Sequence, residues 1–291
     1  MTTTPARAPR VPPASTFAAR LLRELDRELA ATLPRVSSHA DGEAVHDMRV
    51  AIRKTRTLLK CVRPLYGRFH ADSVRAAYTV LHRATGTLRD EEVFRETLDE
   101  LGLGGEILEA FRRSRARREA GLRRHVVALV RAKRVDHARR LLDALLTLPI
   151  HPKRERAADQ FARRMAERAR QRVERQRDAD PSDVVAMHDL RIAYKELRYV
   201  CELFGPVLPS DVAEQARGAA RFQKRIGELH DVDMALAAVT RSRLPVASKA
   251  RVLAALRRLR VRRVEKYVAE MAPAAASLEP AAPPPAPPRA R

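Results

Sequence analysis

One helical motif occurs twice in this chain, and the duplication constrains the fold more than any other feature of the sequence. The two copies are VHDMRVAIRKTRTLLKCVRPLYG at 45–67 and MHDLRIAYKELRYVCELFGPVLP at 187–209. A second matched pair, GTLRD at 86–90 and GELHD at 227–231, follows in the same order and at nearly the same offset. Matched motifs in one order indicate an internal duplication. The repeats that this alignment predicts are residues 15–150 and 153–271.

The residues around these motifs favour helices throughout. Ala, Leu, Arg and Glu dominate the composition, only 10 of the 291 residues are Gly, and no stretch alternates β-branched residues as a strand does. Pro and Gly residues separate the helical segments. The sequence therefore predicts an all-α fold with helices at roughly 15–33, 42–64, 71–87, 90–101, 105–131, 134–148, 153–177, 182–205, 211–227, 231–241 and 246–271. Residues 1–14 and the Pro/Ala-rich residues 272–291 are predicted to be disordered tails.

Both motif helices are preceded by residues typical of a helix N-terminus. Ser38 is followed three residues later by Asp41, and Asp180 is followed by Asp183, with Pro181 at the first predicted helical position. An acceptor side chain at the cap and a carboxylate three residues later satisfy amides that have no partner within the helix. We interpret these residues as structural.

The basic side chains of each motif helix share one narrow face. Residues three, four or seven positions apart lie on the same face of an α-helix. The first stripe contains His46, Arg49, Arg53, Arg56, Lys60 and Arg63, and the second contains His188, Arg191, Lys195 and Arg198. Apolar residues border each stripe on both sides, whereas a solvated helix exposes one wide polar face. We therefore expect the stripes to line a groove or channel.

The net charge and the length of the stripes favour a long anionic ligand. Lys and Arg number 58 against 36 Asp and Glu, which gives a formal net charge of +22, and such a charge favours anionic partners. Arg presents a planar fork to phosphate oxygens, and Lys presents a point charge. The first stripe spans about 21 Å at 1.5 Å per residue, which is long for one phosphate and suits a chain of them.

The motifs VHDMRVAIRKTR and MHDLRIAYKELRY resemble the two signature helices of the CHAD family, the conserved histidine α-helical domain, and GTLRD and GELHD resemble its recurrent Gly turn. The resemblance covers about residues 15–271. It implies two pseudo-symmetric halves, each similar to a four-helix bundle, around a basic central cavity, with inorganic polyphosphate as the ligand. The binding residues that it implies are His46, Arg49, Arg53, Arg56, His188, Arg191, Lys195 and Arg198, with Arg83 and Lys224 before the Gly turns as further candidates. Lys54 aligns with Glu196 and Lys60 with Glu202, so weaker binding is expected in the second half.

The leading hypothesis is a cytoplasmic polyphosphate-binding module that directs proteins to polyphosphate granules or organises those granules. Protonation of His46 and His188 would add positive charge, so this hypothesis predicts tighter binding at pH 6 than at pH 8. No apolar run approaches the ~18 residues that a membrane-spanning helix needs, and residues 1–14 lack the apolar region of a secretory signal. We expect no membrane association.

Nucleic-acid binding is the alternative function. The runs RRSRARREAGLRR at 112–124 and RRLRVRR at 257–263 are typical of nonspecific nucleic-acid patches, and such runs are also common on solvated faces. The chain has no Trp, 7 Phe and 5 Tyr, which disfavours the stacking of single-stranded bases on aromatic rings.

A polyphosphate-acting enzyme is the less favoured third function. The chain offers no Gly-rich phosphate loop and no recognisable nucleophile–base pair, and the stripes lack the carboxylates that hold Mg²⁺. His46 and His188 are each followed by Asp, but that side chain points about 100° away on the helix. We therefore expect no catalysis, no cofactor and no metal site, and we interpret Cys61 and Cys201 as core thiols.

Overall fold

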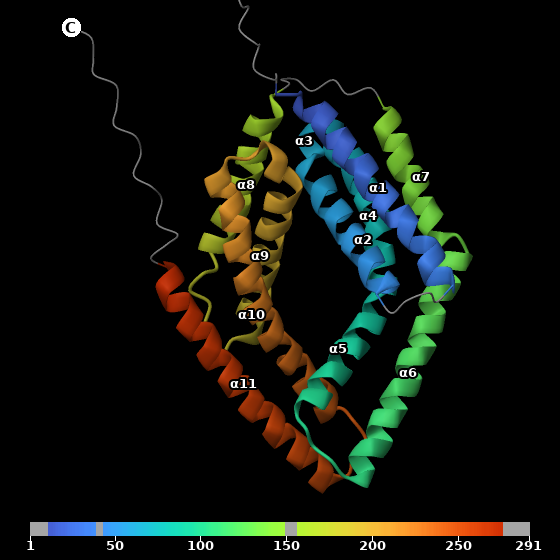
Figure 1. Cartoon of the computed structure of the whole chain (residues 1–291), viewed down its shortest axis with the longest axis vertical. Helices are drawn as coiled ribbons and strands as arrows, with labels where there is room; N and C mark the ends of the chain where they lie inside the picture. The colour runs from blue at the N-terminus through green and yellow to red at the C-terminus, as the bar shows by residue number, and fades with distance from the viewer. Residues whose placement is uncertain (1–10, 39–42, 149–155, 276–291) are drawn as a thin grey trace, which may run out of the picture.

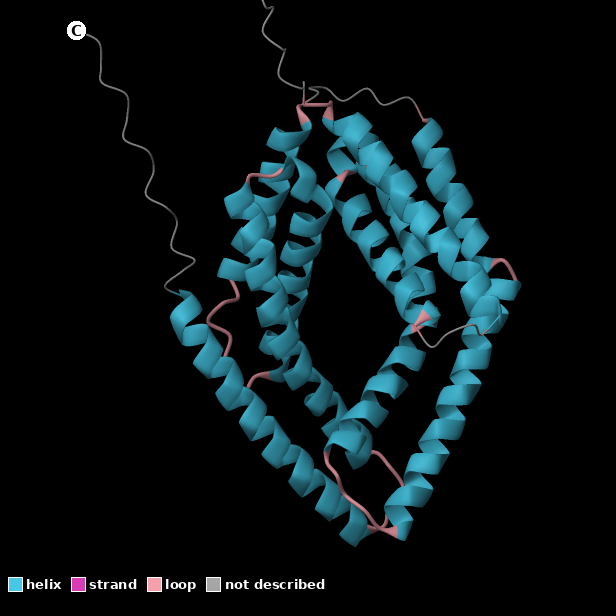
Figure 2. Cartoon of the chain, viewed as in Figure 1, coloured by secondary structure: helices cyan, strands magenta, loops and turns pink. Residues whose placement is uncertain are grey.

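The computed structural model describes residues 11–38, 43–148 and 156–275. Within these ranges the chain forms helices joined by short loops, as Figure 2 shows, and the only extended pairing is an isolated bridge between Pro13 and Ala157. The predicted all-α class is confirmed. The tail residues 1–10 and 276–291 lie outside the described residues, and the helix that precedes the second tail runs slightly further than predicted, to Ala275.

The helices occur in a similar order in the two predicted repeats. The first repeat contains α1 (Ala14–Ser38), α2 (Ala44–Cys61), α3 (Arg63–Tyr66), α4 (Arg68–Ala84), α5 (Gly86–Glu100), α6 (Glu106–Arg131) and α7 (Arg134–Thr147). The second contains α8 (Ala158–Glu174), α9 (Val184–Phe204), the 3₁₀ helix η1 (Gly205–Val207), α10 (Ser210–Thr240) and α11 (Val246–Ala275). A long helix, the motif helix and a short Pro-containing turn open each repeat. This order fits the predicted duplication, whose pseudo-symmetry stays a prediction.

The two motif helices lie in the middle of the molecule. Helix α2 packs between α1 and α4, and α9 packs between α8 and α10. The two motif helices also contact each other, and Figure 1 shows them on the two sides of the molecular centre. Below them, α5 and α6 meet the C-terminal part of α10 and helix α11. The stripes on α2 and α9 are therefore carried by the most central helices of the fold.

A shared hydrophobic core holds the two repeats together. One continuous cluster of buried side chains includes Ile52 of α2 and Leu190 of α9, both fully buried. Phe204 of α9 stacks on Phe17 of α1, with ring centroids 6.1 Å apart, and meets Phe161 of α8 edge-on at 5.9 Å. Because aromatic rings from both repeats interlock here, the repeats form one folded unit rather than two separate cores.

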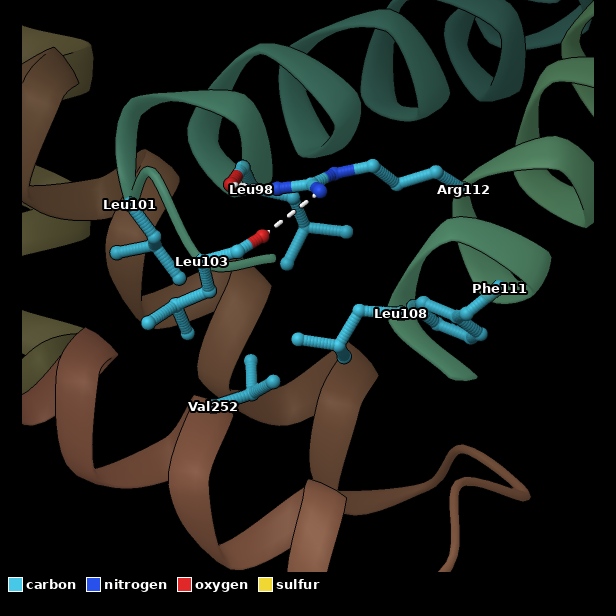
Figure 3. A pocket seen from close by; sticks show the side chains of 7 residues that line it. All are labelled: Leu98, Leu101, Leu103, Leu108, Phe111, Arg112 and Val252. Atoms are coloured by element: carbon cyan, nitrogen blue, oxygen red, sulfur yellow. Dashed lines mark hydrogen bonds between the residues drawn. The ribbon is translucent and has the colours of Figure 1, made fainter. Parts of the chain in front are cut away.

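A second, smaller core lies at the lower end of the molecule. Its buried side chains come from α5, α6, α10 and α11 and include Phe94, Leu108, Val239 and Leu256. A narrow pocket opens beside this core (Figure 3), with a volume of about 10 Å³, which is on the order of the space one water molecule needs. Arg112 at its edge donates to the carbonyl oxygens of Leu98 and Leu103, so we interpret the pocket as a packing gap closed by a structural arginine.

Two predicted helix breaks are wrong because buried residues lie beyond them. Helix α1 continues through Pro34 to Ser38. Val36, beyond the proline, is 2% exposed in the core, and its burial offsets part of the ~3 kcal/mol that a proline within a helix costs. Helix α10 runs unbroken through Gly227, where the prediction placed the end of one helix before another. Ile226 and Leu229 on either side are fully buried, and this burial outweighs the roughly 1 kcal/mol that a helical Gly costs.

The predicted capping residues are also wrong in both motifs. Ser38 is the last residue of α1, its partner Asp41 lies outside the described residues, and α2 begins at Ala44 without a side-chain cap. On the second motif Asp183, rather than Asp180, caps the helix and accepts from the amides of Val185 and Ala186 at 2.9 and 3.0 Å. The cap therefore lies one turn later than predicted, because Asp180 instead accepts from the Ser182 amide at 2.7 Å within the preceding turn.

Replacement of Phe204 tests the core that joins the two repeats. We expect Phe204→Ala to lower the free energy of unfolding by about 3–5 kcal/mol, because it removes a fully buried ring and leaves a cavity. Urea unfolding followed by circular dichroism measures the change. The exposed Val185→Ala on the same helix is the control and should change stability by less than about 0.5 kcal/mol. A loss below 1 kcal/mol for Phe204→Ala would show that this contact does not hold the repeats together.

Candidate functional site

Five basic side chains from three helices lie close together between the motif helices. They are Arg49 and Arg53 of α2, His82 of α4, and Arg191 and Lys195 of α9, and we call them the central cluster. Burial lowers the pKa of His82 to about 3, and the charges of Arg49, Arg56, Arg53 and Lys195 add to this shift. The mutual influence of these charges shows that residues far apart in the sequence share one region. Four of the five are predicted binding residues.

Arg49 is held in place by the end of helix α4. Its side chain is 6% exposed, and its Nη1 donates to Thr85 Oγ1 at 2.7 Å and to the His82 carbonyl oxygen at 3.1 Å. The His82 carbonyl is among the last of α4, where carbonyl groups lack intrahelical partners. Burial, followed by the charge of Arg53, lowers the pKa of Arg49 to about 10. Arg49 therefore stays charged at neutral pH and joins α2 to the α4–α5 break.

Arg191, the counterpart of Arg49 in the second motif, has no such partner. Helix α10 is continuous at the matching point, so its carbonyl groups accept hydrogen bonds from amides of the same helix. Helix α10 passes close to this side chain, since a Cβ atom at Gly227 would lie in ordinary van der Waals contact with Arg191 Nε, at 3.7 Å. Arg191 makes no hydrogen bond or ion pair with any described residue, and its Nε is buried. Its guanidinium donors are consequently available to another molecule.

Arg53 and Lys195 occupy matching positions of the two motifs and lie together. Arg53 Nε donates to the hydroxyl of Tyr199 on α9 at 3.1 Å and so connects the two repeats. Lys195 has no hydrogen bond or ion pair within the described part of the chain. Burial and the charges of Arg191, Arg53 and Arg49 lower the pKa of Lys195 to about 7, and Asp231 opposes this shift. Lys195 therefore lies among three arginines without a partner of its own.

Helix α4 extends the basic region beyond the central cluster. Arg56 Nε donates to Thr79 Oγ1 at 3.0 Å, and its pKa is lowered by burial and then by Arg75, Arg83 and Arg53. Arg75 has a buried Nε without a partner in the described residues. Arg83, a predicted binding residue, is exposed. The basic region thus contains more arginines from α4 than the sequence analysis predicted.

Carboxylates neutralise one end of both stripes. Lys60 pairs with Glu196 across the motif helices, and Arg172 of α8 pairs with the same carboxylate at 2.6 Å. Arg198 pairs with Glu202 at 2.6 Å and donates to Gln223. Lys60 and Arg198 are predicted binding residues, but their charge is already compensated. The unpaired positive charge therefore covers only part of the length of each stripe.

Two aspartates from the matched Gly turns lie near the other end of the basic stripes. The charge of Asp90 opposes the lowering of the pKa values of Arg49 and Arg191, and the charge of Asp231 opposes the lowering of those of Arg191 and Lys195. Burial raises the pKa of Asp231 itself. The central cluster consequently lies between carboxylates at both ends.

The remaining predicted residues lie around the central cluster. His188 is half-buried, with its ring centroid 5.0 Å from that of His230 on α10, while His46 and Lys224 are exposed. Burial and then the charge of Arg191 lower the pKa of His230 to about 4. His46 and Lys224 have no hydrogen bond or ion pair with any described residue.

Sequence analysis missed three basic residues, namely Arg75, His82 and His230. Arg75, Thr79, His82 and Arg83 share one face of α4 by their spacing, which was a usable signal. These residues lie outside the two duplicated motifs, so the duplication did not mark them as a stripe. His230 lies within GELHD, where its partner in GTLRD is Arg89, so the alignment did not mark it as a matched histidine.

Half of the arginines in the two arginine-rich runs are engaged in ion pairs. Arg115 pairs with the buried Glu91 at 2.6 Å, and Arg260 pairs with Asp233 at 2.6 Å. Other arginines of the runs that are paired are Arg112, Arg118, Arg123 and Arg263. Those that are exposed and make no such contact with described residues are Arg113, Arg117, Arg124, Arg257, Arg258 and Arg262. The runs therefore serve partly to pack α5, α6, α10 and α11.

Other predicted features have simple structural outcomes. Cys61 and Cys201 are buried free thiols, as predicted, and burial raises their pKa values to about 12 and about 11. Among the described residues, no three or more His, Cys, Asp or Glu side chains gather in a way that suits a metal ion. None of the described helices is long and apolar enough to cross a membrane. A further depression of about 380 Å³ lies between α1 and α7, and no predicted binding residue lines it.

Comparisons with known proteins agree with this architecture. The family model of the CHAD domain matches residues 19–240. The crystal structure of the CHAD domain from the plant Ricinus communis superposes with a TM-score of 0.71 at 18% identity, covering 92% of this chain and 94% of that one. PptA from Streptomyces chartreusis superposes with a TM-score of 0.59 at 18% identity, covering 91% and 100%.

The structural matches show the fold alone at this identity, and no curated protein sequence matches the chain. The family model, however, covers well over half of the chain and includes both motif helices and both Gly turns. Its match ends at residue 240, where α10 ends. The chain belongs to the CHAD domain family.

Proposed function

We propose that this chain binds inorganic polyphosphate in the central cluster and holds it without cleaving it. Polyphosphate is the ligand that the family resemblance implies, and the net charge of +22 favours a polyanion. The support from the site is independent of the family, because it comes from the charges, the burial and the free donors of the cluster.

The unpaired state of Arg191 and Lys195 is the observation that carries the proposal. Both side chains are half-buried beside Arg49 and Arg53, and neither has a partner in the described residues. Cations that are removed from water without a partner are unfavourable. A bound anion would compensate these charges, and a phosphate chain offers acidic oxygens to several of them at once.

The length of the uncompensated region indicates that a segment of the polymer is bound. Between Arg49 and Arg56 the first stripe covers about 10 Å at 1.5 Å per residue, and beyond it Lys60 is paired with Glu196. Asp90 and Asp231 bound the other end. We infer that a few neighbouring phosphates occupy the cluster and that the rest of a long chain continues past Arg56, Arg75 and Arg83.

The absence of catalysis is part of the proposal. Cleavage of a phosphoanhydride needs positioned metal ions or a nucleophile with its base. The groups nearest to the cluster are arginines, a lysine and histidines of low pKa, and the nearby carboxylates Asp90 and Asp231 interact with Arg49 and Arg191. We propose that the module serves to direct proteins to polyphosphate granules or to organise them.

Nonspecific nucleic-acid binding is the second candidate function. The exposed arginines of α6 and α11, including Arg113 and Arg258, form no ion pair with described residues, and such residues suit contacts with a phosphate backbone. Polyphosphate binding would depend on the central cluster, whereas nucleic-acid binding would depend on the exposed arginines of α6 and α11. Paired variants of equal charge therefore distinguish them.

Removal of two central cations is expected to weaken polyphosphate binding strongly. The variant Arg53→Gln with Arg191→Gln should lower the affinity at least about 100-fold, because each charge-assisted hydrogen bond contributes about 1.5–3 kcal/mol. Arg49 is left intact because its hydrogen bonds to Thr85 and His82 support the fold. Isothermal calorimetry with long-chain polyphosphate measures the change, and circular dichroism checks that the variant is folded.

The matched control removes the same charge from the outer face of α6. Arg113→Gln with Arg117→Gln should change the affinity less than about 5-fold, through the long-range field alone. If this outer variant loses binding and the central one keeps it, the central cluster is not the site and the nucleic-acid candidate is favoured.

Competition with duplex DNA tests the choice of polyanion. At about 0.15 M salt, exposed charges more than ~8 Å apart are largely screened, so only a dedicated site keeps its ligand. We expect calorimetric binding of long-chain polyphosphate to persist in an excess of DNA. Complete displacement by DNA of matched charge would contradict a dedicated polyphosphate site.

A further inference from the structure

The basic residue at position 195 is a lysine, although most basic residues of this chain are arginines. Of the 58 basic Lys and Arg residues only 8 are lysines, and the residue at the matching position of the first motif is Arg53. Arg remains charged at any pH that a folded protein experiences, whereas the charge of a buried Lys responds to its surroundings. A lysine at the centre of the cluster therefore introduces a group that can lose its charge.

The surroundings of Lys195 are strongly positive. Arg191 lies one turn earlier on α9, Arg49 and Arg53 face it from α2, and His82 approaches from α4. Helix α10 contributes Asp231, the acid that opposes the shift, together with His230. Arg172 of α8, the remaining large helix packed on α9, is occupied by Glu196. The amine is half-buried and has no hydrogen bond or ion pair among the described residues.

Burial, followed by the charges of the three arginines, brings the pKa of Lys195 to about 7. The pKa of Arg49 stays near 10, and the pKa values of His82 and His230 are lowered to about 3 and about 4. Near neutral pH the arginine is thus charged and the two imidazoles are neutral. Lys195 is the member of this group that changes its charge in the physiological range.

We propose that Lys195 is a proton-linked ligand contact, and that binding of a polyanion in the central cluster takes up one proton at its amine. This inference rests on the proposed function and adds a regulation by pH to the same site. It differs from the expectation drawn from His46 and His188, because it assigns the pH dependence to a lysine of α9 that lies near arginines of α2.

The direction of the pH effect follows from linkage. Phosphate charges stabilise the ammonium form, so the pKa of Lys195 is higher in the complex than in the free protein. Its contribution to affinity is complete below about pH 7 and decreases as the pH rises towards the pKa of the complex. The decrease reaches up to tenfold per pH unit, because one proton is bound per ligand site.

Calorimetry in buffers of different ionisation enthalpy measures the protons taken up. Long-chain polyphosphate is the probe, since its few terminal groups contribute little titration of their own. At pH 8 the wild-type protein should take up close to one proton per site at the Lys195 amine, because an amine with a pKa of about 7 is then mostly neutral. The variant Lys195→Arg keeps a charge at this position and should take up markedly less, with an affinity that changes little between pH 6.5 and 8.5.

A second measurement needs no ligand. NMR titration of the Lys195 side chain in the free full-length protein should give a midpoint near 7, against about 10.4 for a lysine in a model peptide. A midpoint near 10 for Lys195 overturns the inference. Equal proton uptake by wild type and Lys195→Arg, with polyphosphate bound by both, overturns the inference and leaves the proposed function standing. Failure of the wild type to bind polyphosphate at any pH overturns the proposed function.

Discussion

Unpaired positive charge held in half-buried positions between α2 and α9 is the constraint on which the rest of this structure depends. Arg191 and Lys195 lie beside Arg49 and Arg53 without a carboxylate partner within the described residues, and such an arrangement opposes folding. The continuous core that spans both repeats provides the compensating stabilisation. Its aromatic contact between Phe17, Phe161 and Phe204 joins helices of both repeats.

The two repeats use matching arginines differently, and the reason is a difference in one helix. The break between α4 and α5 leaves the His82 carbonyl and the Thr85 hydroxyl free to accept from Arg49. Helix α10 passes the matching point without a break, so Arg191 finds no comparable acceptor. The first motif thereby contributes a fixed, buried cation and the second contributes a cation with free donors. A duplicated sequence has produced an asymmetric site.

Carboxylates outside the cluster form ion pairs with basic residues of neighbouring helices. Glu196 forms ion pairs with both Lys60 and Arg172, and Glu91 forms ion pairs with Arg115 and Arg118. These pairs attach neighbouring helices to one another and reduce the number of cations that compete for a ligand. The formal net charge of +22 already counts these carboxylates, and it attracts a polyanion at long range.

The sequence by itself determined the helical class, the central place of the motif helices and most of the central cluster. It did so because helix propensity and periodicity are local properties, and because four of the five cluster residues lie on the duplicated stripes. The predicted breaks at Pro34 and Gly227 failed because burial of Val36, Ile226 and Leu229 counteracted the local cost. Only the tertiary structure decided that Lys60 is neutralised by Glu196, that His82 enters from α4, and that Lys195 lies among three arginines. These outcomes depend on which helices pack side by side, and that information is not contained in the spacing of residues along one helix.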